Sequence, residues 1–454
     1  MKAIIIGMGK SGKCAMYALN DLGYELSIQD SKDPEKAEPE VVAYCKENNI
    51  TEFYGSMPDD FSSYDMMVLS PGVDPEKDFV QKAKAQGCEI VGELELAYRL
   101  ARGTFIGITG TNGKTTTTTL VGEIFKASGR KTHVVGNIGL PVISVAREST
   151  EEDWMVTEVS SFQLQTVTEF RPKVSAILNL TPDHLNRHHT MELYGLAKAA
   201  IWQNQGTDDY LVMNIDDPVL MKLCLEDVPG ELEAKLIPFS RKTEPEVGAY
   251  LMGSELVLKD EDGAVHKIID KSELKIIGDH NIENALAAAA ICYFSGIPTE
   301  VIANTLREFK GVEHRLEFVD EIDGVKYYND SKGTNTDASL IAMKALEKDI
   351  ILIAGGDAKM QDFTDFAKEL EGRAKTVLLF GRDRGMIKEA MDKAGYTAYE
   401  ELNDLEECVD RACELAVPGD KVLLSPACAS WDMYPRFEVR GEHFKECVAK
   451  ISKR

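Results

Sequence analysis

The chain has 454 residues, of which 44% are hydrophobic and 28% are charged, and its formal net charge at pH 7 is −25. This length favours about three domains at roughly 150 residues each, and the negative charge argues against nonspecific binding to nucleic acids or anionic membranes. The nine cysteines contain no C-x-x-C pair and no run approaches about 18 apolar residues, so we expect a cytoplasmic protein with reduced thiols and no membrane insertion.

The N-terminal segment places a glycine-rich loop between a strand and a helix. Residues 3–6 (AIII) have the pattern of a buried strand, residues 7–12 read GMGKSG, and residues 14–19 have a helical pattern. The G-x-G-x-x-G spacing is typical of dinucleotide-binding folds, and Asp30 ends a second apolar run, where a ribose-binding acid is often found. Residues 66–72 (MMVLSPG) predict a further strand and the loop at its end. From these residues alone, a dinucleotide site and a turn that only packs the helix both remain possible.

The most informative motif is a second glycine-rich loop. An apolar run at 104–108 leads into GTNGKTT at 110–116, and a helical pattern follows at 120–125. Glycines let a loop turn its amide groups toward a phosphate, and the start of a helix adds partial positive charge. In such a loop, Lys114 can reach the outer phosphates of a nucleoside triphosphate and Thr115 can bind Mg²⁺. The spacing G-x-x-G-K-T-T is shorter than that of the common phosphate loop, which has four residues between its glycines.

Three further apolar runs in the middle of the chain lead into polar segments. The runs cover residues 154–157, 174–178 and 210–213, and the segments read EVSSFQL, NLTPDH and NIDDP. Parallel strands end at one edge of a sheet, so we expect these segments at the same edge as GTNGKTT. Residues 241–275 alternate weakly and predict a strand-rich excursion, and residues 278–290 predict a capped, alanine-rich helix.

Two side chains in these polar segments are candidates for binding Mg²⁺. Glu158 lies just past one strand and His184 ends another, at positions where a carboxylate and an imidazole could reach a metal at the sheet edge. By pattern alone, Lys198 reads as a surface lysine on a helix, and His188 and His189 read as exposed loop residues.

From about residue 311 the alternation of strands and helices begins again. Apolar runs cover 326–328, 350–354, 376–380 and 421–424, and the loops that follow them read NDSKGTN, GGDAKMQ, GRDR and SPACASWD. This pattern predicts another open α/β sheet. Four basic side chains lie at these loops or at domain junctions and could hold a phosphate or bind a carboxylate: Arg315, Lys332, Lys359 and Arg382.

Taken in order, the segments GTNGKTT, EVSSFQL, TPDHLNRH, GDHNIENALAA, EHRLEF, NDSKGTN and LSPACASWD make the chain similar to the Mur ligases over nearly its whole length. Within this family it resembles the members that add D-glutamate, on the pieces SSFQL, GNIGLP and SPACAS. The resemblance implies three α/β domains: a Rossmann-like domain at 1–97, a central phosphate-loop domain at 98–310 and a C-terminal Rossmann-like domain at 311–454. The first would bind the uridine diphosphate of a sugar substrate, the second ATP, and the third an amino acid.

The resemblance also implies a reaction. A ligase that requires ATP and Mg²⁺ would join D-glutamate to UDP-N-acetylmuramoyl-L-alanine through an acyl phosphate, in the synthesis of peptidoglycan precursors. These small molecules would be its partners, without nucleic acid, and we expect the chain to act as a monomer.

The family's functional residues fall on matching positions of this sequence. The catalytic groups would be Lys114, Glu158, His184 and Lys198, and Mg²⁺ would be bound by Thr115, Glu158, His184 and Lys198, whose counterpart in the family is carbamylated. ATP would contact Gly110, Thr111, Asn112, Gly113, Lys114, Thr115, Thr116, Asn281, Arg315 and Asp330. The sugar nucleotide would contact Gly9, Lys10, Ser11, Asp30, Ser31, Gly72, Asn137 and Ser160. D-Glutamate would contact Lys332, Thr334, Lys359, Ser430 and Phe437.

Two positions depart from the family pattern in the expected amino-acid pocket. The loop GGDAKMQ lacks a glycine before Lys359, and Trp431 stands in place of a smaller aliphatic residue. The alternatives within the ligases are another Mur enzyme and a folylpolyglutamate synthase, which shares G-x-x-G-K-T. A nicotinamide-dependent oxidoreductase would leave GTNGKTT unexplained, and a noncatalytic nucleotide sensor would bind ATP without turnover.

Overall fold

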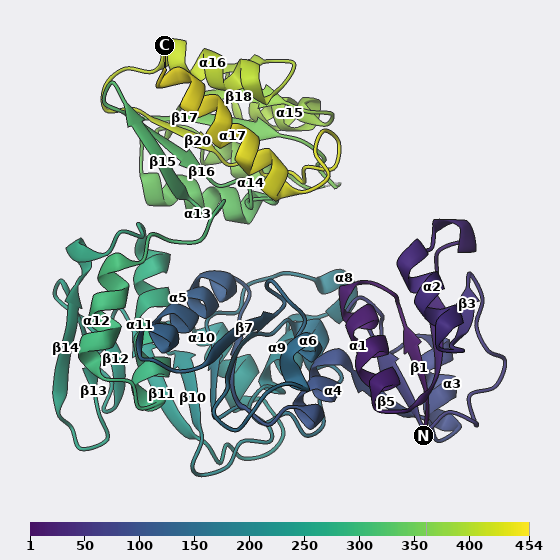
Figure 1. Ribbon diagram of the computed structural model, residues 1–454. Coiled ribbons are helices and arrows are strands. Elements are labelled where there is room, and N and C mark those ends of the chain that lie inside the picture. Colours follow the sequence, from purple (N-terminus) through teal and green to yellow (C-terminus); the bar gives the residue numbers. More distant parts are fainter. Residues whose placement is uncertain (360, 454) are drawn as a thin grey trace. The chain divides into compact units, whose positions relative to one another are not determined.

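The structure is a computed structural model that describes residues 1–359 and 361–453. The chain forms two compact units: unit 1 consists of Met1–Leu274 and Ile282–Glu308, and unit 2 consists of Lys275–Asn281 and Phe309–Arg454. Unit 1 contains two sheets and unit 2 contains one, each with helices packed on it (Figure 1). The predicted α/β class is therefore confirmed, whereas the domain boundaries expected at 97/98 and 310/311 stay predictions.

The first sheet of unit 1 is parallel throughout and is drawn in purple and blue in Figure 1. Its strand order is β3-β2-β1-β4-β5, from β1 (Lys2–Ile6), β2 (Glu25–Asp30), β3 (Thr51–Tyr54), β4 (Met66–Leu69) and β5 (Glu89–Gly92). The helices are α1 (Lys10–Asp21), α2 (Pro39–Glu47), α3 (Asp78–Ala85) and α4 (Glu93–Leu100). The chain reverses its direction of winding between β1 and β4, the place where open α/β sheets bind ligands.

The second sheet of unit 1 has nine strands in the order β14-β13-β12-β11-β10-β9-β6-β8-β7. Its parallel part contains β6 (Thr104–Thr109), β7 (Thr132–Gly136), β8 (Trp154–Glu158), β9 (Val174–Ile177), β10 (Tyr210–Asn214) and β11 (Lys235–Ser240). The predicted strand-rich excursion is an extension of this sheet by β12 (Gly248–Met252), β13 (Glu255–Lys259) and β14 (Val265–Asp270), and the last two pairings are antiparallel. Because β6 lies between β9 and β8, the loops after these three strands meet at one edge.

The helices that accompany the second sheet differ greatly in length. They are α5 (Lys114–Ala127), α6 (Ile143–Ala146), α7 (Ser161–Leu164), α8 (Leu185–His188), α9 (Met191–Ala199), α10 (Pro218–Met221), α11 (Asp279–Phe294) and α12 (Thr299–Glu308). The predicted alanine-rich helix is confirmed as α11, and α12 packs on α5 and on β14.

Unit 2 is a six-stranded sheet in the order β15-β16-β20-β17-β18-β19. The strands are β15 (Glu317–Ile322), β16 (Val325–Asn329), β17 (Ile350–Gly355), β18 (Ala374–Phe380), β19 (Tyr399–Glu401) and β20 (Lys421–Leu424), all parallel except for the β15–β16 hairpin. One face packs on α13 (Thr336–Leu346), α14 (Thr364–Lys368) and α15 (Arg384–Ala394), and the other on α16 (Leu405–Leu415) and α17 (Phe437–Ile451). The loops after β16, β20 and β17 therefore share an edge.

The two sheets of unit 1 are joined by a shared core and by one buried carboxylate. Ala3 and Ile5 on β1 belong to the same hydrophobic cluster as Phe105 on β6 and Phe170 in the segment before β9. Glu95 on α4 has no exposed surface. Its two oxygens accept hydrogen bonds at 3.0–3.2 Å from the backbone amides of residues 168–170, from the Thr168 hydroxyl and from the Arg99 guanidinium. This carboxylate fixes the first sheet to the second.

We predict that Glu95→Ala destabilises unit 1 strongly, because three backbone amides lose their buried acceptor and Arg99 loses one of its carboxylate partners. The expected loss in the free energy of unfolding is about 3–5 kcal/mol, measured by urea denaturation. The matched control is Glu169→Gln, since the Glu169 side chain is 66% exposed and pairs with the same arginine; that change should cost less than about 1 kcal/mol. Equal effects of the two substitutions would contradict the role given to Glu95.

Candidate functional site

The loop between β6 and α5 has the backbone of a phosphate-binding loop. Gly110 and Gly113 adopt φ angles of 154° and 82°, which residues with a side chain rarely adopt. A Cβ atom on Gly113 would also lie 2.3 Å from Oδ1 of Asn284. The first amide groups of α5 point out of its N-terminus, beginning at Lys114, because they have no acceptor within the helix. This arrangement suits an anion.

Two lysine side chains meet at one carbonyl oxygen of this loop. The Lys114 Nζ donates to the Gly110 carbonyl at 2.9 Å and to the Thr111 carbonyl at 2.8 Å. The Lys198 Nζ donates to the same Gly110 carbonyl at 2.8 Å. Burial lowers the pKa of Lys198 well below its usual value, and the charge of Lys114 lowers it further. The site therefore favours either a neutral amine at Lys198 or an anion beside it.

The expectation of a surface position for Lys198 is wrong, because this side chain is only 1% exposed. Its ammonium lies 4.6 Å from the ring centre of Tyr194, one turn earlier on α9. The Tyr194 hydroxyl in turn lies 3.3 Å from the Thr111 Oγ1. A tyrosine and a lysine four residues apart share one helix face, and here that face covers the phosphate loop.

Glu158 presents a buried carboxylate oxygen without a donor. It is the last residue of β8, not the first after it, and it is 2% exposed. Its Oε1 accepts a hydrogen bond from the Asn137 Nδ2 at 2.9 Å, whereas Oε2 has no partner among the described residues. An unpartnered buried carboxylate oxygen is costly unless a cation binds it, so Glu158 fits the expected Mg²⁺ site. Thr115, the other expected ligand from this edge, is buried in the first turn of α5.

His184 lies in the loop beyond β9, not at the end of a strand as expected. It immediately precedes α8, with a φ angle of 53°, and its ring centre is 4.9 Å from that of Phe162. Its side chain is 50% exposed, and partial burial lowers its pKa. The charges of Lys114 and Lys198 add to this shift, whereas Asp183, at 3.5 Å, opposes it. A neutral imidazole is the form that binds metals, so its surroundings suit the predicted role.

His188 corrects another sequence-based expectation. It is 3% exposed, whereas the pattern suggested an exposed loop residue. Its Nε2 lies 2.9 Å from the Ser161 Oγ, and its ring stacks on Phe162 at 5.5 Å between centres. Burial lowers its pKa to about 4, which favours a neutral, structural histidine.

The sequence did not single out Asn179, which holds the phosphate loop. Its Oδ1 accepts hydrogen bonds from the amides of Thr111 at 3.1 Å and Asn112 at 2.8 Å. Its Nδ2 donates to the Asn112 carbonyl at 3.0 Å. The Thr181 amide, two residues later, donates to the Thr111 Oγ1 at 3.0 Å. Asn179 is the first residue of the polar segment NLTPDH, and the neighbouring position of β9 and β6 is what brings it to the loop.

The glycine loop after β1 is organised by Asp30. The Asp30 Oδ2 accepts a hydrogen bond from the Met8 amide at 2.8 Å, and a Cβ atom on Gly12 would lie 2.0 Å from the Gly7 carbonyl oxygen. The Lys10 Nζ donates to the Gly139 carbonyl at 3.1 Å. This contact joins the first glycine loop to the segment GNIGLP of the second sheet.

The other residues expected at the sugar nucleotide surround these two segments. Asn137 bonds to Glu158, so the sugar-nucleotide and metal candidates are in contact. Ser160 caps α7, with its hydroxyl accepting from the Gln163 amide at 3.3 Å. The remaining four lie at the start of α1 or in exposed loops after β2 and β4: Gly9, Ser11, Ser31 and Gly72.

In unit 2, Gln361 joins the loops that carry the expected amino-acid contacts. Its Nε2 lies within 3.1–3.4 Å of the carbonyl oxygens of Thr334, Ala358 and Ala427, which belong to the loops after β16, β17 and β20. Its Oε1 accepts from the Thr336 amide at 3.2 Å. The sequence did not predict this role. The neighbouring residue Met360, part of the GGDAKMQ loop, lies outside the described residues.

Two cation–aromatic pairs lie among the residues expected to contact D-glutamate. The Lys332 ammonium is 5.8 Å from the ring centre of Phe437, and the Lys359 ammonium is 4.2 Å from that of Trp431. Ser430 is buried beside Trp431 in the chain. Arg382 instead pairs with Asp357 at 3.1 Å and with a second acid, so its charge is neutralised within unit 2.

Buried charges of both signs lie below these loops. Burial raises the pKa of Asp330 to about 6, and its carboxylate accepts from the Ser425 hydroxyl at 2.7 Å. Arg440 has no exposed surface, and burial lowers its pKa to about 10. The Arg440 Nη1 and the Arg315 Nε have no hydrogen-bond partner among the described residues.

Asn281, another residue expected to contact ATP, belongs to unit 2, and its side chain donates to the Ile277 carbonyl at 2.8 Å.

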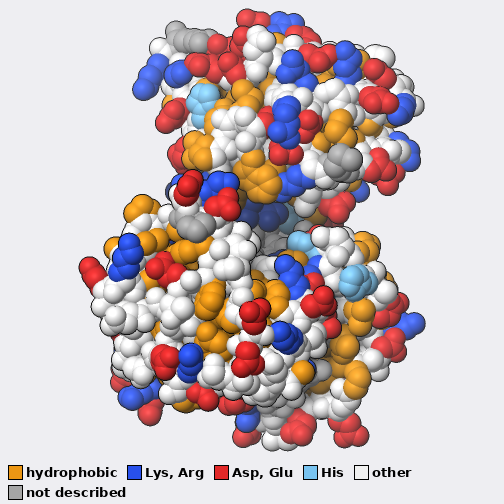
Figure 2. Space-filling view, turned by 90° about the vertical axis from the view of Figure 1, so that its right-hand side faces the viewer, with side chains coloured by type: hydrophobic (Ala, Val, Ile, Leu, Met, Phe, Trp, Pro, Cys, Tyr) orange, Lys and Arg blue, Asp and Glu red, His pale blue; other side chains and the backbone are white. Residues whose placement is uncertain are grey.

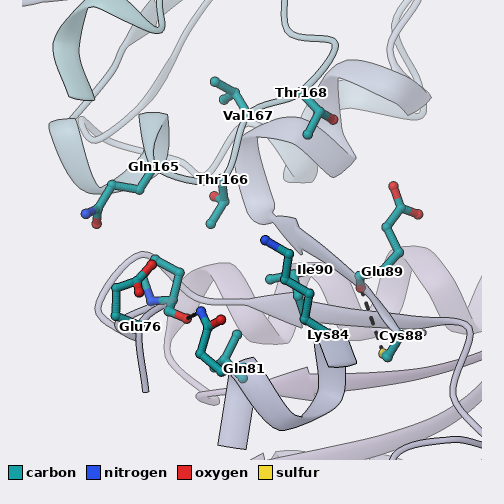
Figure 3. A pocket seen from close by; sticks show the side chains of 12 residues that line it. Glu76, Gln81, Lys84, Cys88, Glu89, Ile90, Gln165, Thr166, Val167 and Thr168 are labelled. Atoms are coloured by element: carbon teal, nitrogen blue, oxygen red, sulfur yellow. Dashed lines mark hydrogen bonds between the residues drawn. The ribbon is translucent and has the colours of Figure 1, made fainter. Parts of the chain in front are cut away.

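Two other features do not coincide with the expected sites. Glu313, His314 and Glu442 lie close enough to hold a cation, but the Lys445 ammonium already pairs with both acids, at 3.2 and 2.8 Å. A pocket of about 470 Å³ lies between α3 and β5 on one side and residues 165–168 on the other (Figure 3). None of the predicted site residues lines this pocket.

On the face drawn in Figure 2, acidic side chains do not gather in one place. Figure 2 shows acidic and basic side chains interspersed on the visible face, without one large acidic patch. No helix among the described residues is both long and apolar enough to cross a membrane.

We predict that Asn179→Ala weakens binding of Mg²⁺-ATP about tenfold, as measured by calorimetry. The substitution removes the side-chain acceptor of the Asn112 amide and one of two acceptors of the Thr111 amide, which keeps its bond to the Asn179 carbonyl. The loop is then held less firmly and must be ordered when the nucleotide binds. The control is Asn204→Ala. The Asn204 side chain also binds backbone groups, but these are the carbonyls of Thr168 and Phe170, outside the phosphate loop. Unchanged ATP affinity in a folded Asn179 variant would show that this clamp is dispensable.

Family models match the three parts of the chain. The Mur ligase MurD-like N-terminal domain matches residues 1–92, the Mur ligase middle domain matches 108–292, and the Mur ligase glutamate ligase domain matches 314–428. A solved UDP-N-acetylmuramate-alanine ligase from Thermotoga maritima has a TM-score of 0.60 over 99% of both chains at 19% identity, so it supports the fold.

Curated relatives are similar to the chain over its full length. The UDP-N-acetylmuramoylalanine–D-glutamate ligase of Alkaliphilus metalliredigens is 47% identical over 453 residues, which are 99% of this chain and 98% of that protein. The protein of the same name from Clostridioides difficile is 45% identical over 451 residues, with the same two shares. Identity of this degree over the full length, together with the three matching domain models, means that the chain belongs to the Mur ligase family.

Proposed function

We propose that the protein is an ATP-dependent ligase that adds D-glutamate to UDP-N-acetylmuramoyl-L-alanine in the synthesis of peptidoglycan precursors. The observation that carries this proposal is the identity of 42–47% over almost the whole chain to relatives that bear the name of that ligase. The phosphate loop with its two lysines and the partly unpartnered Glu158 carboxylate support the same conclusion. A nicotinamide-dependent oxidoreductase is inconsistent with membership of this family.

The reaction that we propose has two bond-forming steps. An oxygen of the terminal alanine carboxylate attacks the γ-phosphorus of ATP, forms an O–P bond and releases ADP. The amine of D-glutamate then adds to the acyl carbon of this acyl phosphate, a C–N bond forms, and inorganic phosphate leaves as the amine loses a proton. The carboxylate must be activated because its own oxygen is a poor leaving group when an amine attacks the carbon, whereas phosphate is a good one.

The chain's own residues would mainly manage negative charge. Lys114 and the first amides of α5 would hold the β- and γ-phosphates of ATP, so that an anionic carboxylate can approach them. Thr115, Glu158, His184 and Lys198 would hold Mg²⁺, with Lys198 as its carbamate. The bound metal would supply positive charge against the phosphate oxygens.

The remaining substrate contacts are also proposals. For ATP they are Gly110, Thr111, Asn112, Gly113 and Thr116 in unit 1, and Asn281, Arg315 and Asp330 in unit 2. For the sugar nucleotide they are Gly9, Lys10, Ser11, Asp30, Ser31, Gly72, Asn137 and Ser160, and for D-glutamate Lys332, Thr334, Lys359, Ser430 and Phe437. We also propose a cytoplasmic location, in agreement with nine cysteines that form no disulfide, and a monomeric state.

The first test is which substrates release phosphate from ATP. We expect release in the presence of Mg²⁺ only when UDP-N-acetylmuramoyl-L-alanine and D-glutamate are both present, because the acyl phosphate forms on one and is captured by the other. The measurement is a continuous phosphate assay with single omissions. Equal release with L-glutamate, or release with a folate in place of the muramyl nucleotide, would refute the proposal. No release at all with the complete mixture would favour a nucleotide sensor.

The second test separates stability from activity at Lys198. We expect Lys198→Met to abolish phosphate release while stabilising the protein without ligands by about 1–4 kcal/mol, because a buried amine beside the charge of Lys114 gives way to an apolar chain of similar length. The measurements are the phosphate assay and thermal unfolding. Lys126→Met on α5 is the control, since that lysine is half exposed and both properties should stay unchanged. A Lys198 variant that unfolds at a lower temperature would contradict this account.

A further inference from the structure

Lys359, which is expected to bind the amino-acid substrate, lies with its ammonium against the ring of Trp431. The ammonium lies 4.2 Å from the ring centre, well within the range of a cation–π interaction. The Trp431 side chain is 65% exposed, so the ring is not part of the core. The indole thus contributes little to packing and has the Lys359 ammonium over its ring.

An antiparallel bridge joins the two loops that carry these side chains, although it does not itself pair Lys359 with Trp431. Asp357 and Ala429 form an isolated antiparallel bridge, with both amide-to-carbonyl distances at 2.9 Å. Lys359 and Trp431 each lie two residues further along the chain. The Lys359 backbone has a φ angle of 47° and its amide donates to the Asp357 Oδ1 at 3.1 Å, which turns this residue at the end of the bridge.

The nearby acids do not take the charge of Lys359. The carboxylates of Asp357 and Asp383 pair with the Arg382 guanidinium at 3.1 and 3.3 Å. The Asp432 Oδ2 accepts a hydrogen bond from the Arg382 amide at 2.8 Å. Within the described part of the chain, the Lys359 ammonium forms no salt bridge and its contact is the indole ring. A π-face attracts a cation without using its N–H donors, which stay available to an anion.

We propose that Trp431 is a positioning residue for the amino-acid substrate: its ring holds the Lys359 ammonium so that the ammonium can bind a carboxylate of the incoming amino acid. This inference rests on the proposed function, and it assigns a role to Trp431, one of the two positions at which the chain departs from the family pattern. The hydrogen bonds of the Gln361 side chain support this role, because they connect the loop of Lys359 to the loops that carry Thr334 and Ala427.

The experiment is steady-state kinetics with each of the three substrates varied in turn. For Trp431→Leu we expect the KM for D-glutamate to rise about fivefold, with kcat and the KM values for ATP and the sugar nucleotide within about twofold of the unchanged protein. Trp431→Phe keeps a π-face and should retain most of the affinity. Trp431→Gln serves as a second nonaromatic variant if the leucine variant does not fold.

A double-mutant cycle separates positioning from a general structural effect. If the ring acts through the ammonium, Trp431→Leu should cause no further rise of the D-glutamate KM in a Lys359→Ala background. Tyr399→Leu is the matched control, because it removes a cation–π contact of 5.8 Å with Lys388 elsewhere in unit 2 and should leave all three KM values unchanged.

The outcomes distinguish this inference from the proposed function. If the unchanged protein does not use D-glutamate, the proposed function fails. If it uses D-glutamate, three results would refute the positioning role of Trp431. Trp431→Leu could leave the KM for D-glutamate unchanged or raise all three KM values alike. Its effect on the KM for D-glutamate could also be as large in the Lys359→Ala background as in the unchanged protein.

Discussion

The arrangement of the site depends on two amines that share one carbonyl oxygen. Lys114 and Lys198 both donate to Gly110, and the second of them is buried beside the charge of the first. Like charges this close repel each other, and burial removes the water that would screen them. A protonated Lys198 therefore carries an electrostatic cost at the phosphate loop of the protein alone, which favours the neutral amine. An anion in the loop, or conversion of the Lys198 amine into an anionic group, would remove that cost.

The surrounding structure is what keeps this strained arrangement in place. The loop cannot relax freely, because Asn179 holds the amides of Thr111 and Asn112, and Asn284 lies against Gly113. Behind it, the shared hydrophobic core and the Glu95 carboxylate fix the first sheet to the second. The contact between Lys10 and Gly139 then connects the first glycine loop to the segment that bears Asn137. A nucleotide bound at either loop of unit 1 would thus meet a preformed backbone.

The sequence predicted the parts of this structure that depend on local pattern. Continuous apolar runs such as those of β1 and β17 gave strands at the right places, and GTNGKTT predicted the loop and helix that follow β6. Short or polar strands such as β15 and β19 were missed, because acidic residues interrupt their apolar pattern and pairing with a neighbour defines them. Lys198 and His188 were placed on the surface for a related reason. Their burial comes from contacts distant in sequence, with Gly110 and Ser161, which no local pattern encodes.

The charge balance of the chain gives these local contacts their importance. All three proposed substrates are anions, whereas the protein has a net charge of −25. At about 0.1 M salt the field of exposed charges is screened beyond roughly 10 Å, so recognition depends on the groups next to each ligand. In unit 1 these are helix amides and two lysines around Gly110. In unit 2 they include Lys359, whose ammonium lies against the ring of Trp431, and a ring holds a cation without neutralising it, unlike the carboxylates that pair with Arg382. An acidic enzyme can bind acidic substrates when basic groups such as Lys198 and Lys359 lie against a carbonyl oxygen or an aromatic ring at the site.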